Sequence, residues 1–185
     1  MIRFLLTLVS LLSVLGSASA SAALPAAQTT PIPRDRRPDF RPFRFMVGRW
    51  NCSVESSRRP RPFPATSTTE VTPDGYWLVT TMSTPPVPWN NIRITAKDYI
   101  TYDPTRSLWV DLTMDDYGLY GVSTSKGWAD GAIVWDDVMF PKSHATSMHL
   151  PRIERKNGDR SITSIQRFKE PSGAQFSVTT SCTKA

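Results

Sequence analysis

The fold of this chain is decided by the stretch FMVGRWNCSV, which occupies residues 45–54. Alternate side chains of a β-strand share a face, so Trp50 and Cys52 are predicted to lie on the same side of a strand. Near the C-terminus, FSVTTSC at residues 176–182 has a similar strand-like pattern and ends on the only other cysteine, Cys182. If these two segments are neighbouring strands, they close a β-barrel, and a bond between the two cysteines would cross-link its first and last strands.

Residues 1–22 have the pattern of a secretory signal peptide. A basic residue, Arg3, precedes an apolar run at residues 4–16, and a run of small residues follows it. The apolar run is too short for an ordinary membrane span. We therefore expect export to the periplasm or the medium, with no stable membrane insertion after cleavage. Residues 23–42, rich in Pro and Arg, are predicted to be a flexible leader, and residues 43–185 a single domain.

Export places the two cysteines in an oxidising compartment, where an isolated pair is more often a disulfide than a metal site. His144 and His149 do not stand at a zinc-site spacing from the cysteines. We therefore predict a disulfide between Cys52 and Cys182 and no bound metal.

The formal net charge of +6 comes from one part of the chain. Between Arg34 and Arg61, nine arginines stand against three acidic residues, and the arginines alternate with proline. A nucleic-acid-binding surface would carry aromatic residues on a folded face between its basic ones. We therefore expect a solvated arm and no nucleic-acid partner, with contact to a polyanion or a membrane surface as the alternative.

From residue 43 onward the chain reads as short strands separated by turn signals, with no segment that favours an amphipathic helix. The Pro73-Asp74-Gly75 and Asn157-Gly158 turns are of kinds that join antiparallel strands. The strands expected before the second turn are 47–56, 65–71, 76–83, 92–102, 108–114, 118–125 and 132–140. Short connections favour a meander, and a meander of this size usually closes. The prediction is an all-β fold, a single closed antiparallel barrel of about eight to ten strands.

Gly48-Arg49-Trp50 resembles the opening of the lipocalin and calycin-like barrels. Two further segments, GYWLV at residues 75–79 and CTK at residues 182–184, are similar to a group of exported bacterial lipocalin-like domains. The resemblance covers the whole predicted domain. It implies an interior cavity for a small, mostly apolar ligand, with Gly48 and Trp50 as structural residues.

Large aromatic side chains are more numerous than a close-packed interior of this size needs, so some are expected to line a ligand pocket. Core packing is the alternative for each of them. The residues predicted to bind the ligand are Trp77, Trp109, Trp128, Trp135, Tyr120 and His149. Trp89, in a proline-rich loop, is either a lid over the barrel mouth or a surface residue.

Asp111 would be a general base or a ligand anchor if it lay inside the barrel. It shares a strand face with Trp109 and Thr113. The opposite face, made of alternate residues from Leu108 to Met114, is more apolar. We therefore expect the apolar face to point inward and Asp111 to point to solvent.

These observations predict an exported, monomeric barrel that binds a small hydrophobic or amphipathic molecule without a cofactor. Two alternatives stay open. One is a barrel enzyme, an isomerase, cyclase or hydrolase, in which His144 or His149 is the acid or base. The other is a haem-binding barrel, because nitrobindin-like barrels open with a similar Gly-x-Trp segment and ligate iron through a histidine late in the chain.

Overall fold

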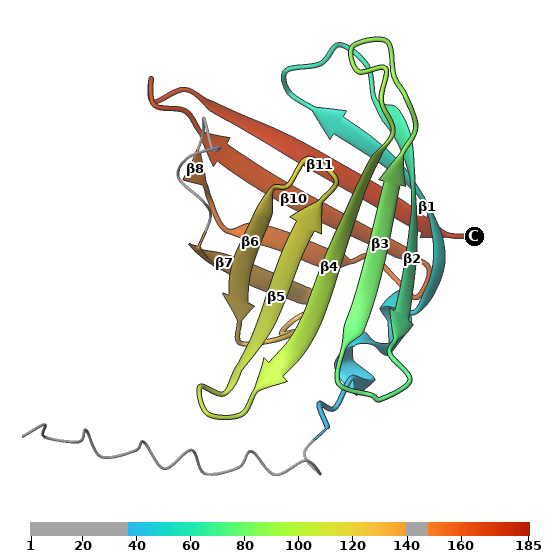
Figure 1. Ribbon diagram of the computed structural model, residues 1–185, viewed down its shortest axis with the longest axis vertical. Helices are drawn as coiled ribbons and strands as arrows, with labels where there is room; N and C mark the ends of the chain where they lie inside the picture. The colour runs from blue at the N-terminus through green and yellow to red at the C-terminus, as the bar shows by residue number, and fades with distance from the viewer. Residues whose placement is uncertain (1–36, 140–147) are drawn as a thin grey trace, which may run out of the picture. The chain divides into compact units, whose positions relative to one another are not determined.

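The chain forms a closed antiparallel β-barrel of ten strands, shown by a computed structural model that describes residues 37–139 and 148–185 (Figure 1). Successive strands are neighbours around the barrel. The exception is the two-residue β8, which among the described residues pairs only with β10, beside β9, and is not counted among the ten. The strands are β1 (Gly48–Ser56), β2 (Phe63–Val71), β3 (Leu78–Thr84), β4 (Ile94–Asp103), β5 (Leu108–Asp115), β6 (Tyr120–Ser125), β7 (Ala132–Met139), β8 (Met148–His149), β9 (Arg152–Lys156), β10 (Ser161–Lys169) and β11 (Gln175–Lys184). The predicted all-β meander barrel is confirmed.

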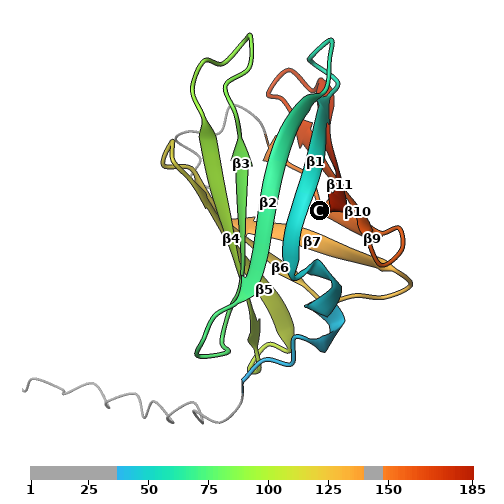
Figure 2. The ribbon, with the colours of Figure 1, turned by 90° about the vertical axis from the view of Figure 1, so that its right-hand side faces the viewer.

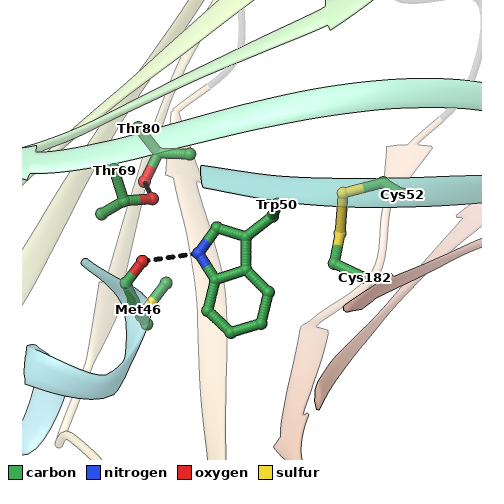
Figure 3. Close-up of a disulfide and its surroundings, with 6 residues drawn as sticks. All are labelled: Met46, Trp50, Cys52, Thr69, Thr80 and Cys182. Carbon is green, nitrogen blue, oxygen red and sulfur yellow. Dashed lines mark hydrogen bonds between the residues drawn. A yellow bond between two sulfur atoms is a disulfide. The ribbon is translucent and has the colours of Figure 1, made fainter. Parts of the chain in front are cut away.

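The barrel closes between its first and last strands. β1 pairs with β2 on one side and with β11 on the other, and β11 pairs in turn with β10. In this register Cys52 stands directly opposite Cys182, and the two form a disulfide across 130 positions of sequence (Figure 3). The predicted pairing is therefore confirmed, and it lies at the seam of the barrel.

β1 shows how the two-residue period of the sequence becomes an inner and an outer wall. Trp50, Cys52 and Val54 are 4%, 7% and 4% exposed, whereas Asn51 and Ser53 between them are exposed. Alternation of this kind buries one face of each strand and leaves the other in water. The buried face of β1 belongs to a core cluster that includes the disulfide.

A short 3-10 helix, η1 (Arg41–Met46), covers one end of the barrel (Figure 2). Its Phe43 is completely buried, with ring centroids 4.5 Å from Trp109 and 6.2 Å from Trp128. Gly127 lies so close to Trp109 that a Cβ on it would come within 3.1 Å of the indole nitrogen, and its φ of +103° also favours glycine. Aromatic packing therefore fills the barrel at the η1 end.

The Gly-x-Trp segment joins η1 to the barrel wall. The indole N–H of Trp50 donates a hydrogen bond of 2.7 Å to the carbonyl oxygen of Met46, the last residue of η1 (Figure 3). Gly48 has a φ of +125°, and the side chain of Lys184 lies against it. These contacts place the end of η1 beside the first residues of β1.

Part of the segment predicted to be a flexible leader contacts the barrel. The ring centroid of Phe40 lies 5.7 Å from that of Trp109. The predicted signal peptide, residues 1–22, lies outside the described residues. Within residues 37–139 and 148–185, no helix has the length and apolar character that a membrane span requires.

We expect the Cys52→Ala, Cys182→Ala double variant to fold and to lose stability. Without the cross-link, the unfolded chain regains the entropy of a loop of 130 residues, and the loss is up to about 4–5 kcal/mol. Urea denaturation followed by circular dichroism measures it.

The matched control for this variant is Ser53→Ala with Ser181→Ala, an exposed pair that faces each other at the next position of the same two strands. This control should unfold at nearly the same urea concentration as the parent protein. Equal urea midpoints for the parent and the cysteine variant would mean that the disulfide does not stabilise the closure.

Candidate functional site

A cavity of about 260 Å³ lies inside the barrel. Its apolar lining comes from η1, from the middle strands and from the closing strands. The apolar residues of the lining are Met46, Trp50, Met82, Ile100, Ile162 and Cys182, which is part of the disulfide. The remaining lining side chains are polar, so the cavity has two chemically distinct parts.

Three of the six neutral polar residues of the lining, Thr69, Thr80 and Gln166, form hydrogen bonds to other parts of the protein. The hydroxyl groups of Thr69 and Thr80 bond each other at 2.9 Å, from neighbouring strands (Figure 3). The amide of Gln166 donates to the carbonyl oxygens of Leu150 and Arg167, at 2.6 and 2.9 Å. Much of the hydrogen-bonding capacity of these groups is therefore used within the barrel wall.

The charged residues of the lining form a cluster, which we call the acidic cluster: Asp98 on β4, Asp111 on β5, and Arg152 and Glu154 on β9. Strands β5 and β9 are separated by β6 and β7, so these side chains meet across the interior. Arg152 donates from Nη2 to Oδ2 of Asp111, and its Nε lies 3.2 Å from Oε1 of Glu154. Asp98 accepts a hydrogen bond of 2.7 Å from the hydroxyl of Thr113.

Asp111 is the most deeply buried member of the acidic cluster. It is 0% exposed, and only one of its two carboxylate oxygens is bonded. The other oxygen, Oδ1, has no hydrogen-bond partner among the described residues. A buried carboxylate oxygen without a donor is costly for the protein, so Asp111, which lines the cavity, has acceptor capacity that the described residues do not satisfy.

Burial and the neighbouring charges shift the pKa values of Asp111, Glu154 and Arg152. Burial, helped by the charge of Asp98, raises the pKa of Asp111 to about 7 against the opposing effect of Arg152. Burial also raises the pKa of Glu154. For Arg152, burial lowers the pKa, but the charges of Asp111 and Glu154 raise it by more, so the guanidinium stays charged. Asp111 and Glu154 therefore retain a proton to higher pH than free carboxyl groups do.

Most of the aromatic residues predicted to bind ligand pack elsewhere. Trp109 and Trp128 belong to the packing around Phe43 at the η1 end. Trp77 is half-buried with its ring centroid 6.3 Å from that of Tyr99. None of these three tryptophans lines the cavity.

The other predicted residues differ in their surroundings. Trp135 is fully buried, and the guanidinium of Arg152 lies 5.5 Å from its ring centroid, so it supports the acidic cluster from behind without lining the cavity. Tyr120 is 51% exposed. The backbone of His149 pairs with Phe168, but its side chain, like the whole of His144, lies outside the described part.

The expectation that Asp111 points to solvent is wrong. The inner face of β5 carries Trp109 and Asp111, and the apolar alternate residues lie on the outer face, where Met114 is 43% exposed. On that outer face Leu112 stands opposite Tyr99 of β4, so cross-strand neighbours cover it partly. The outer face of β5 is therefore the more apolar one, and its sequence pattern looks like that of an inner face.

Asp98, Arg152 and Glu154 were not singled out by sequence reasoning. The signal that points to them is the pair of opposite charges two residues apart on β9, because residues at that spacing share a strand face. Trp89 contacts Phe63 and Arg59 and does not line the cavity.

Within the described ranges, no three His, Cys, Asp or Glu side chains are grouped so that they could hold a metal ion. No protein-family model matches the chain, and no curated protein matches it. The geometry of the cavity is therefore the basis on which function can be argued.

We expect the stability of the parent protein, relative to Asp111→Asn, to fall as the pH rises from about 4 to about 7. The pKa of Asp111 is raised from 3.8 to about 7, so the folded state binds this proton more tightly than the unfolded state does, and its stabilising effect disappears as the proton leaves. Urea midpoints at a series of pH values measure the difference.

The control for the pH dependence is Asp159→Asn, which removes an exposed carboxylate whose pKa is lowered by its hydrogen bond to Lys156. Here the dependence should have the opposite sign, because a lowered pKa stabilises the folded state above the ordinary ionisation range. A stability difference between the parent and Asp111→Asn that does not change with pH would show that Asp111 ionises at its ordinary pKa, and one that rises with pH would show that its pKa is lowered.

Proposed function

We propose that the chain is an exported barrel that binds a small hydrophobic or amphipathic molecule in its interior cavity. The observation that carries this proposal is the cavity itself, about 260 Å³ inside a closed wall of strands. Small-molecule pockets are typically about 300–1,000 Å³. At about 260 Å³ the cavity lies just below that range, so it suits a small ligand enclosed within a single copy of the protein.

The apolar part and the charged part of the lining would contribute to ligand binding in different ways. Burial of an apolar ligand body against Met82, Ile100 and Ile162 contributes about 25 cal/mol for each Å² removed from water. The acidic cluster offers a directional contact that fixes the orientation of the ligand. A molecule with a short apolar body and one polar group satisfies both parts.

Export to the periplasm or the medium is part of the proposal. The disulfide between Cys52 and Cys182 supports it, because such bonds persist in oxidising compartments. The closed sheet supports a monomer, since closure leaves no long strand edge for pairing with a second copy.

We expect Ser164→Phe to weaken binding of 1-hexanol, a small amphipathic probe, by at least about tenfold. Ser164 lines the cavity, so a phenyl ring there occupies ligand space. The matched control is Thr163→Phe, because the preceding residue of β10 points to the other face of the strand. Isothermal titration calorimetry measures both affinities, and equal binding by both variants would place the probe outside the barrel.

A barrel enzyme is the second candidate, favoured by one observation. The pKa of about 7 given to Asp111 by burial suits a group that accepts or donates a proton at neutral pH. Two steps separate the functions. The compound that co-purifies with the exported protein is extracted and identified by mass spectrometry, and it is then added back to the protein in excess to see whether it is converted. Turnover that disappears in Asp111→Asn would replace the binding proposal, and recovery of the unchanged compound would support it. A Soret band in the visible spectrum would instead indicate haem.

A further inference from the structure

We infer that the ligand of the cavity is a small organic cation, a protonated amine on a short apolar body, whose charged nitrogen is bound by the acidic cluster. This inference rests on the proposed function and specifies its ligand class. It comes from the charge balance of the lining and from an acceptor oxygen that the protein leaves unbonded.

When its three carboxyl groups are ionised, the lining of the cavity carries a net negative charge. Three carboxyl groups, those of Asp98, Asp111 and Glu154, face the cavity, and Arg152 is the one cationic side chain among the described lining residues. Arg152 already donates to Asp111 and lies 3.2 Å from Glu154, so its charge is shared between two partners. A second positive charge, supplied by the ligand, would bring the cluster closer to neutrality.

The unbonded oxygen shows where that charge would be placed. Asp111 is fully buried and lines the cavity, and its Oδ1 has no partner among the described residues. An ammonium group carries three donors and no acceptor, so it can bond Oδ1 and a second carboxylate at once. In contrast, the hydroxyl groups of Thr69 and Thr80 already bond each other.

An anionic ligand would meet the opposite situation. To reach Arg152 it would have to enter beside the carboxylates of Asp111 and Glu154, which lie against the guanidinium, and it would add negative charge next to them. A neutral alcohol could donate one hydrogen bond to Asp111 but would leave the excess charge unchanged. The cluster therefore discriminates in favour of a cation.

The apolar part of the lining requires the cation to carry a hydrocarbon body. Trp50, Met82 and Ile162 line the same cavity as the acidic cluster. A fully hydrated inorganic cation would bury its water shell against these side chains without benefit, whereas an alkyl chain gains from the contact.

Cation binding in this cavity should depend on pH. The groups that face Asp111 are Asp98 from β4 and Arg152 and Glu154 from β9, with the indole of Trp135 from β7 behind them. The other strands that line the cavity contribute uncharged side chains to it. Because burial raises the pKa of both Asp111 and Glu154, protonation at low pH would remove the negative charge that attracts the ligand.

The test compares three probes of equal chain length on the exported protein: hexylamine, 1-hexanol and hexanoate. At about pH 8, where an alkylamine is still protonated, calorimetry should show hexylamine binding at least about tenfold more tightly than hexanol, with hexanoate the weakest. At about pH 5 the preference for the amine should shrink, because Asp111, whose pKa is raised to about 7, takes up a proton.

Variants locate the amine. Asp98→Asn changes a half-buried residue and Asp111→Asn a fully buried one, and each should reduce the preference for hexylamine over hexanol. Asp159→Asn removes the same charge from an exposed position outside the cavity and should leave the preference unchanged. If Asp111→Asn does not fold, as judged by circular dichroism, Asp98→Asn and Glu154→Gln carry the test.

The outcomes separate this inference from the function on which it rests. Equal affinity for hexylamine and hexanol, or tightest binding of hexanoate, would overturn the cationic ligand and leave the binding barrel in place. Loss of hexylamine preference in Asp159→Asn would also overturn it, because the amine would then be attracted to the surface. Failure of all three probes to bind, in both the parent protein and Thr163→Phe, would overturn the proposed function as well.

Discussion

The pairing of β1 with β11 is the constraint on which the rest of the structure depends. Because this pairing closes the sheet, every strand except the short β8 has two neighbours, and the interior becomes a space enclosed by the strands. The disulfide between Cys52 and Cys182 sits at the seam and holds the register at one position. A slip of one residue along this seam would turn every inward side chain of a strand outward, including Trp50.

Closure also explains why the interior contains both a packed region and a cavity. The barrel is filled by aromatic rings where η1 enters it, with Phe43 between Trp109 and Trp128. Barrels that close with more than about eight strands are wider than their own side chains fill. Beyond the aromatic packing, the ten strands therefore leave a space into which polar side chains from β4, β5 and β9 project.

The strands and turns could be predicted from local patterns, and the closure and the disulfide from the length of the meander and the isolated cysteine pair. Alternation, turn residues and an isolated cysteine pair are visible without knowing which residues meet in space. The acidic cluster depends on a contact across the interior, between residues 111 and 152, and no local pattern encodes it. The inner face of β5 could not be predicted for the same reason. A buried carboxylate such as Asp111 needs a charged partner, and that partner, Arg152, comes from the distant strand β9.

The acidic cluster is hard to explain as a stabilising device. Burial of an ion pair contributes little to stability compared with apolar residues of similar volume, and the two further carboxyl groups, which have no cation of their own, add to the cost. Local rules that a structure breaks without compensation are typical of functional sites. In this barrel two such rules are broken. An oxygen of Asp111 is buried without a hydrogen-bond donor, and the ionised cluster has more negative than positive groups. Both are relieved by the same event, the arrival of a positively charged donor, and this makes ligand binding a simpler account of the cluster than stability.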